Sequence, residues 1–188
     1  MTQFTRHTAE TAPAASKPLV EGAQKTYGFL PNLLATMAES PAMLEGYMTL
    51  AGIFDKTSLT ETERQIILMT NNRLNGCIYC MAAHTTISQM KGVPEDVITA
   101  LRENTPIADA KLEALRVFAE KVNTSRGWPD ESDVQALLSA GYSKQTVFDV
   151  ILGTGLKVLS NYTNHVAKTP LDDAFVSNAW LHEGQLAR

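Results

Sequence analysis

A chain of 188 residues with 44% hydrophobic and 19% charged residues is expected to form one globular domain, which excludes global disorder. Its net charge of −4, with no run of five or six basic residues, excludes a broad nucleic-acid-binding surface and a basic membrane patch. Apolar runs such as residues 66–69 are too short to span a bilayer, and residues 1–16 lack the regions of a secretory signal. We therefore predict a cytoplasmic protein with no nucleic-acid and no membrane partner, whose cysteines rest as thiols.

Helix start and stop signals recur along the whole chain. They predict helices at about residues 17–26, 32–39, 41–54, 61–75, 77–91, 94–102, 108–124, 130–140 and 143–168. No segment shows the alternation of β-branched and polar residues that is typical of a strand. The prediction is an all-α, single-domain helical bundle, with a polar segment at 1–16, the helical domain at 17–170, and a docked helix with a loose tail at 171–188.

Particular residues set some of these boundaries. Ser58 and Glu61 form the Ser-x-x-Glu pattern of a capping box before the helix at 61–75. Gly76 is expected to end that helix, so that Cys77 lies at the start of the next one. Gly153 and Gly155 fall inside the last long helix, where they indicate either an interruption or a close helix crossing.

The strongest chemical signal is the pattern Cys77-x-x-Cys80-x-x-x-His84. Positions i, i+3 and i+7 of an α-helix project within an arc of about 60°, so the three side chains share one face. A thiol at a helix N-terminus is stabilised as the thiolate, and His84 can take or return a proton. A thiolate with a second thiol one turn away can attack a peroxide or a disulfide and then be resolved as an intramolecular disulfide.

Other interpretations of the same residues remain open. Cys77, Cys80 and His84 could be three ligands of a zinc ion, with His165 as a fourth. The two cysteines could also be small hydrophobic core residues. A thioredoxin-like motif would need a neighbouring βαβ pattern, which is absent from this sequence.

Two stretches around the motif, residues 59–65 (LTETERQ) and residues 74–85 (LNGCIYCMAAHT), resemble the carboxymuconolactone decarboxylase superfamily in its alkyl hydroperoxidase D-like branch. Residues 161–167 (NYTNHVA) are similar to its larger, peroxidase-related members. The resemblance implies an all-helical trimer or hexamer with thiol peroxidase or disulfide reductase activity in antioxidant defence. It also implies a hydroperoxide substrate, no bound cofactor, and an external dithiol donor such as a lipoyl group or a thioredoxin-like protein.

The resemblance assigns Cys80 as the peroxidatic cysteine and Cys77 as the resolving one. The helix dipole alone would select Cys77 as the more acidic thiol, so the two arguments disagree, and we follow the resemblance. The family places a relay glutamate where this chain has Gln65, which can orient His84 but cannot accept a proton at neutral pH. Glu63 is about 200° away on the same helix and is a poor replacement.

The sequence thus predicts catalytic Cys80, Cys77 and His84, with Gln65, Glu63 and His165 as possible supporting residues. The leading hypothesis is a thiol-dependent peroxidase or disulfide reductase. A zinc-binding helical protein and a non-enzymatic oligomeric member of the family are the alternatives.

Overall fold

The computed structural model describes residues 3–181, and within this range it is entirely helical, with no strand. The helices are α1 (Lys17–Tyr27), α2 (Asn32–Met37), α3 (Pro41–Phe54), α4 (Glu61–Leu74), α5 (Ile78–Met90), α6 (Glu95–Glu103), α7 (Ala110–Thr124), α8 (Glu131–Ser139), α9 (Lys144–Ala167) and the short 3-10 helix η1 (Asp173–Asn178). The predicted all-α fold is confirmed, and each predicted helix is present with ends shifted by at most a few residues.

The start of α4 differs from the prediction. Its N-cap is Thr60, whose hydroxyl oxygen accepts a hydrogen bond from the Glu63 N–H at 3.2 Å. The Glu63 carboxylate accepts in return from the Thr60 N–H at 2.8 Å. Thr60 and Glu63 therefore form the capping box, and the predicted pair of Ser58 and Glu61 was wrong by two residues because both pairs fit the same four-residue pattern.

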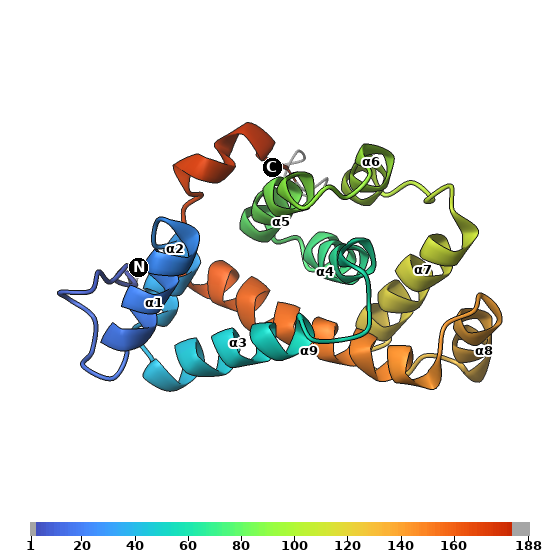
Figure 1. The fold of residues 1–188 in the computed structure, drawn as a ribbon, viewed down its shortest axis with the longest axis horizontal. Coiled ribbons are helices and arrows are strands. Elements are labelled where there is room, and N and C mark those ends of the chain that lie inside the picture. The colour runs from blue at the N-terminus through green and yellow to red at the C-terminus, as the bar shows by residue number, and fades with distance from the viewer. Residues whose placement is uncertain (1–2, 182–188) are drawn as a thin grey trace.

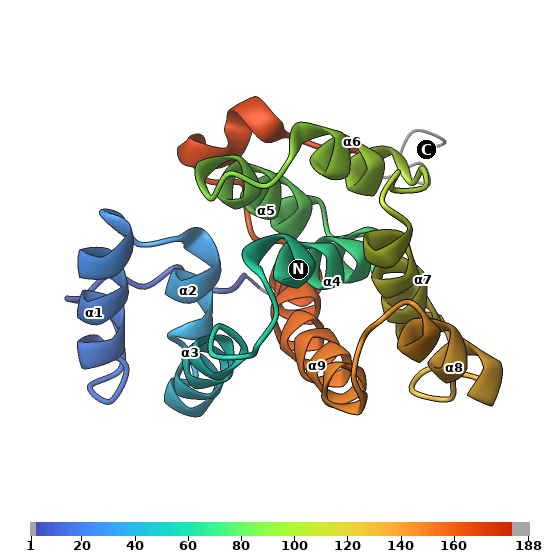
Figure 2. The ribbon, with the colours of Figure 1, turned by 45° about the vertical axis from the view of Figure 1, so that its right-hand side comes forward.

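Helix α4 lies in the middle of the molecule, and α5, α7 and α9 pack around it (Figures 1 and 2). The main core forms between these helices, from side chains such as Ile66, Ile67, Leu115, Phe118 and Val150. A second cluster of buried residues joins α1, α2 and α3 to the first half of α5 and includes both cysteines. The cysteines thus lie where the N-terminal helices meet the central bundle.

Helix α9 is continuous through Gly153 and Gly155, so the glycines do not interrupt it. A Cβ atom at Gly153 would lie 2.7 Å from Cγ2 of Ile67 and 2.9 Å from Cε2 of Phe54. Gly153 therefore marks a close crossing of α9 with α3 and α4, which is one of the two meanings that the sequence left open.

The ends of the described chain are held against this bundle. The 3-10 helix η1 packs on α5 (Figure 1). Near the other end, the Ser16 hydroxyl donates to the Ala38 carbonyl at 2.8 Å. The predicted loose tail falls on residues 182–188, outside the described residues. Within residues 3–181, no helix is both long and apolar enough to cross a membrane.

Candidate active site

The two cysteines lie at the start of α5. Gly76, with a φ of +66°, turns the chain out of α4, and Cys77 follows as the N-cap of α5. Its Sγ accepts a long hydrogen bond from the Cys80 N–H at 3.4 Å. Both thiols are free and almost fully buried, with 1% of Cys77 and none of Cys80 exposed. The spacing therefore brings them together at a helix start.

Helix α9 contributes a side chain that touches both sulfur atoms. Nδ2 of Asn164 lies 3.1 Å from Sγ of Cys80 and 3.7 Å from Sγ of Cys77. The amide N–H donates to sulfur, which favours a thiolate over a thiol as its acceptor. Oδ1 of the same side chain is buried without a hydrogen-bond partner.

The surroundings make the two cysteines chemically unequal. Burial opposes ionisation of Cys80, but the hydrogen bond from the Cys77 thiol, the nearby Lys157 ammonium and hydrogen bonds with Asn161 and Ser160 outweigh it and lower the pKa of Cys80 to about 5. The same hydrogen bond with Cys80, together with burial, raises the pKa of Cys77. The surroundings thus favour the thiolate at Cys80 and the thiol at Cys77.

His84 is held between α4 and α9. Its Nδ1 lies 2.8 Å from Oε1 of Gln65, which can only accept, so Nδ1 carries the proton. Its Nε2 lies 3.0 Å from Nζ of Lys157 and accepts from the ammonium. Burial and the positive charge of Lys157 hold the pKa of His84 well below its usual value, so the imidazole is neutral.

Lys157 and Asn164, both on α9, are site residues that the sequence did not predict. Lys157 is only 1% exposed, which is unusual for a lysine. Lys157 lies on the buried face of α9, four residues after Gly153 and one after Leu156. A lysine on an apolar helix face was the feature of the sequence that could have indicated a buried charge. The two residues lie two turns apart and flank the thiols.

A network of buried asparagines fixes α9 against α4 and α5. Asn161 donates to Oδ1 of Asn72 at 3.0 Å and accepts from Nδ2 of Asn75 at 2.8 Å. Asn72 in turn donates to the Cys80 carbonyl at 3.2 Å. These bonds set the position of α9, and therefore of Lys157 and Asn164, relative to the cysteines.

The remaining predicted supporting residues fall in different places. Gln65 contacts His84 directly, and its amide donates to the Glu61 carboxylate at 2.8 Å. Glu63 serves the helix cap and does not line the space beside Cys80. His165 is exposed and stacks on Tyr162, so it does not join the thiol site.

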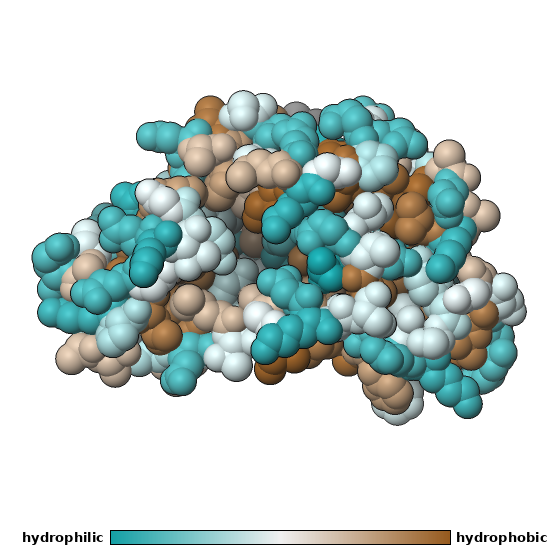
Figure 3. Space-filling view, viewed as in Figure 1, coloured by the Kyte–Doolittle hydropathy of each residue, from teal (hydrophilic) through white to brown (hydrophobic). Residues whose placement is uncertain are grey.

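A hollow of about 280 Å³, which we call the thiol pocket, opens onto Cys80, His84 and Lys157. Its wall is mainly apolar and includes the aromatic rings of Tyr27, Phe29, Tyr47, Tyr79 and Phe175. No Asp or Glu lines it. The molecular surface is hollowed between the α1–α2 end and the α4–α5 region, where these elements meet (Figure 3). An apolar molecule could therefore bind in this pocket beside His84 and Lys157, next to the buried Cys80.

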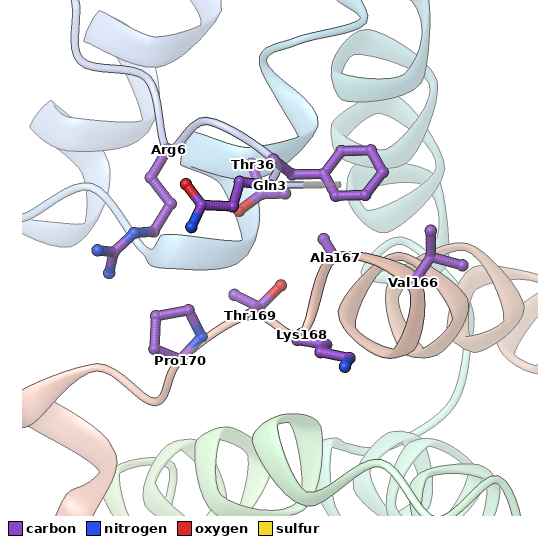
Figure 4. Close-up of a pocket in the computed structure, with 9 residues that line it drawn as sticks. Gln3, Arg6, Thr36, Val166, Ala167, Lys168, Thr169 and Pro170 are labelled. Atoms are coloured by element: carbon purple, nitrogen blue, oxygen red, sulfur yellow. The ribbon is translucent and has the colours of Figure 1, made fainter. Parts of the chain in front are cut away.

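A larger hollow of about 660 Å³ lies between the N-terminal segment and the end of α9 (Figure 4). Residues such as Gln3, Arg6, Thr36 and Thr169 line it. It contains no cysteine or histidine, so it offers neither a thiol nor an imidazole.

The geometry gives little support for a zinc site. Among residues 3–181, no three His, Cys, Asp or Glu side chains are arranged so that they could hold a metal ion. The Nε2 atom of His84, which would face a metal shared with the cysteines, instead faces the Lys157 ammonium.

Comparisons with known proteins agree with the sequence resemblance. Residues 41–120 match the model of the carboxymuconolactone decarboxylase family. No curated protein gives a significant match. An uncharacterized peroxidase-related protein with an alkylhydroperoxidase AhpD core from Ralstonia eutropha JMP134 is 23% identical, with 93% of this chain and 96% of that chain covered and a TM-score of 0.77.

Two further solved structures have the same fold. A peroxidase-related protein from Silicibacter sp. TM1040 is 22% identical, with 93% of this chain and 97% of that chain covered and a TM-score of 0.76. The debrominase Bmp8, solved with 2,3,4-tribromopyrrole, is 20% identical, with 95% of this chain and 96% of that chain covered and a TM-score of 0.79. These solved structures confirm the all-helical fold, and the match to the carboxymuconolactone decarboxylase family covers residues 41–120.

Proposed function

We propose that this chain, a member of the carboxymuconolactone decarboxylase superfamily with the alkyl hydroperoxidase D-like fold, is an antioxidant enzyme that reduces hydroperoxides through Cys77 and Cys80. The observation that carries the proposal is the buried pair of unequal cysteines, in which the surroundings lower the pKa of Cys80 and raise that of Cys77. A low-pKa thiolate is the nucleophile, and an adjacent thiol resolves its oxidised form.

The proposed oxidation has two steps. The Cys80 thiolate attacks one oxygen of the hydroperoxide ROOH, the O–O bond breaks, and a sulfenic acid and the alkoxide RO⁻ form. The alkoxide takes a proton and leaves as ROH. The Cys77 thiol then attacks the sulfenic sulfur, and hydroxide leaves with the thiol proton as water, which forms the Cys77–Cys80 disulfide.

The disulfide must be reduced by an external dithiol. A dithiol donor such as a lipoyl group or a thioredoxin-like protein would attack the disulfide, return two electrons and two protons, and leave as its own disulfide. If a protein disulfide, in place of a hydroperoxide, oxidised Cys77 and Cys80, the chain would act as a disulfide reductase. In the cytoplasm, the proposed location, thiol donors keep the resting pair reduced.

We also propose that the chain forms a homo-oligomer. Helix α9 carries a row of large apolar side chains on its outer side, which we call the α9 stripe: Phe148, Ile151, Tyr162 and Val166, with between 48% and 69% of each residue exposed. Large exposed apolar side chains on one helix support an interface on this face. Sedimentation velocity should give a particle of several chains, and Tyr162→Asp should shift it toward the monomer.

Counting free thiols before and after hydroperoxide tests the enzymatic proposal. The wild type should lose both thiols after one equivalent of cumene hydroperoxide and regain them with dithiothreitol. Cys77→Ser should stop at a sulfenic acid on Cys80, and Cys80→Ser, the matched control, should keep its thiol. Two thiols that survive stoichiometric hydroperoxide would overturn the proposal, and one bound zinc per chain with unreactive thiols would favour the metal-binding alternative.

A second candidate is reductive dehalogenation of a small aromatic ring. The aromatic wall of the thiol pocket supports it, as does the shared fold with the debrominase Bmp8. The thiolate would take the halogen from carbon, the carbon would gain a proton, and Cys77 would displace halide from sulfur to give the same disulfide. Release of bromide from a bromopyrrole, one per disulfide formed, would distinguish this reaction from peroxide reduction.

A further inference from the structure

The buried lysine of α9 has no part in the chemistry that the sequence predicts. We infer that Lys157 carries the catalytic proton between the oxidation and the reduction of the cysteine pair, and that neutral His84 holds the amine in position. The inference rests on the proposed function, because it names the group that supplies and recovers the proton of that reaction.

The thiol pocket holds few charges besides that of Lys157. The Lys157 side chain is buried, and the thiol pocket that it lines with Cys80 contains no carboxylate. The titratable groups around the pocket are Tyr27 of α1, Tyr47 of α3, Cys77 just before α5, and Tyr79, Cys80 and His84 of α5. Glu61 of α4 lies behind Gln65, and the buried Asp172 carboxylate accepts hydrogen bonds from the Tyr79 hydroxyl and the Asn32 N–H. Burial raises the pKa of each of these three tyrosines, so their hydroxyls stay neutral. The Cys80 thiolate is therefore the counter-charge of the Lys157 ammonium.

The imidazole of His84 is fixed on both sides. Both ring nitrogens of His84 are engaged, since Nδ1 donates to Gln65 and Nε2 accepts from Lys157. To take up a proton, the ring would have to give up its bond with Lys157 and carry a second buried positive charge beside the first. His84 therefore positions the amine, and the proton that can be moved is on Lys157.

The charge at Cys80 changes during the proposed turnover. Attack on the hydroperoxide converts the thiolate into a neutral sulfenic acid, and the buried ammonium loses its counter-charge. When Lys157 gives one proton to the leaving alkoxide, the ammonium and the alkoxide both become neutral, and Lys157 is left as a neutral amine. When a dithiol later reduces the disulfide, one of its two protons returns to Lys157 and the other to Cys77, which restores the starting state.

Three variants separate the charge of Lys157 from its proton. Lys157→Met removes both, and we expect the midpoint of the pH profile for Cys80 alkylation by iodoacetamide to rise by at least two pH units. Lys157→Arg keeps a positive charge that is not lost at neutral pH, so the low midpoint should remain while turnover with cumene hydroperoxide and dithiothreitol falls at least tenfold. Lys144→Met, which changes an exposed lysine at the start of the same helix, is the matched control and should behave as the wild type.

The readouts distinguish the possible failures. If the Lys157→Met profile superimposes on that of the wild type, or if Lys157→Arg turns over at the wild-type rate, the inference is wrong even though the peroxidase works. If the wild type consumes no hydroperoxide, the proposed function is wrong. In that case the inference about Lys157 would still be supported if dithiothreitol reduced the Cys77–Cys80 disulfide tenfold more slowly in Lys157→Arg than in the wild type. Should Lys157→Met lose its circular dichroism spectrum, Lys157→Gln replaces it in the alkylation experiment.

Discussion

The close crossing at Gly153 gives a prediction whose size follows from two contacts. A methyl group at this position would lie 2.7 Å from Ile67 and 2.9 Å from Phe54, both well inside van der Waals contact and both in the packed core. Overpacking of this kind costs about 1–3 kcal/mol, and the better helix propensity of alanine returns at most about 1 kcal/mol. With the full offset, we expect Gly153→Ala to lower the free energy of unfolding by up to about 2 kcal/mol.

Gly155 is the matched control for this experiment. It lies two residues further along the same helix, and a Cβ atom there would meet no heavy atom within 4 Å. Gly155→Ala should therefore gain the propensity without the clash and stabilise the protein by up to about 1 kcal/mol. Urea denaturation at equal protein concentration measures both variants, with an unchanged m-value as the check that only stability differs. If Gly153→Ala proves as stable as Gly155→Ala, the crossing is looser than described and the reasoning fails.

Four further predictions concern the thiol site and its walls. Folding lowers the pKa of Cys80, so ionisation of this thiol stabilises the folded protein. This stabilisation is complete above the ordinary thiol pKa of about 8.5 and is lost as the pH falls toward about 5. The urea midpoint of the wild type relative to that of Cys80→Ser should therefore drop between pH 9 and pH 6. Asn164→Leu removes a hydrogen bond to the thiolate of about 1.5–3 kcal/mol, which should raise the midpoint of Cys80 alkylation by one to two pH units. Tyr79→Phe removes the bond from the Tyr79 hydroxyl to the buried Asp172 carboxylate and should lower the free energy of unfolding by about 1–3 kcal/mol. Gln65→Glu places a second negative charge near Lys157, so it should raise the alkylation midpoint of Cys80, and a lower midpoint would contradict the charge balance that we infer.

The sequence was sufficient for the parts of the fold that depend on local chemistry. Gly28 ends α1 in the left-handed conformation, and Pro41 opens α3, because these residues act within their own turn of helix. The capping box of α4 was placed two residues early because Ser58 and Thr60 both precede a glutamate by three residues. Only the extended backbone at Thr60 decides between them.

The thiol site was predictable only on its α5 side. Cys77, Cys80 and His84 are neighbours in sequence, so helical spacing alone places them together. Lys157 and Asn164 reach the same point from a helix more than 70 residues away, through a crossing that the sequence indicates only by Gly153 and Gly155. His165, one residue from Asn164, was the more conspicuous candidate by residue type, but the helix turns it outward.

The charge of the site explains why Gln65 and Lys157 occur together. A carboxylate at position 65 next to His84 would favour the imidazolium and supply a proton acceptor, which is the role that the resemblance implies for a glutamate at this position. Here the cation beside His84 is already present as Lys157, and it is balanced by one thiolate. A second anion would compete with Cys80 for that cation, whereas a neutral amide fixes the imidazole without changing the balance. The neutral Gln65 and the buried Lys157 therefore belong to one arrangement. In it, the amine of Lys157 carries the proton in place of a carboxylate at position 65.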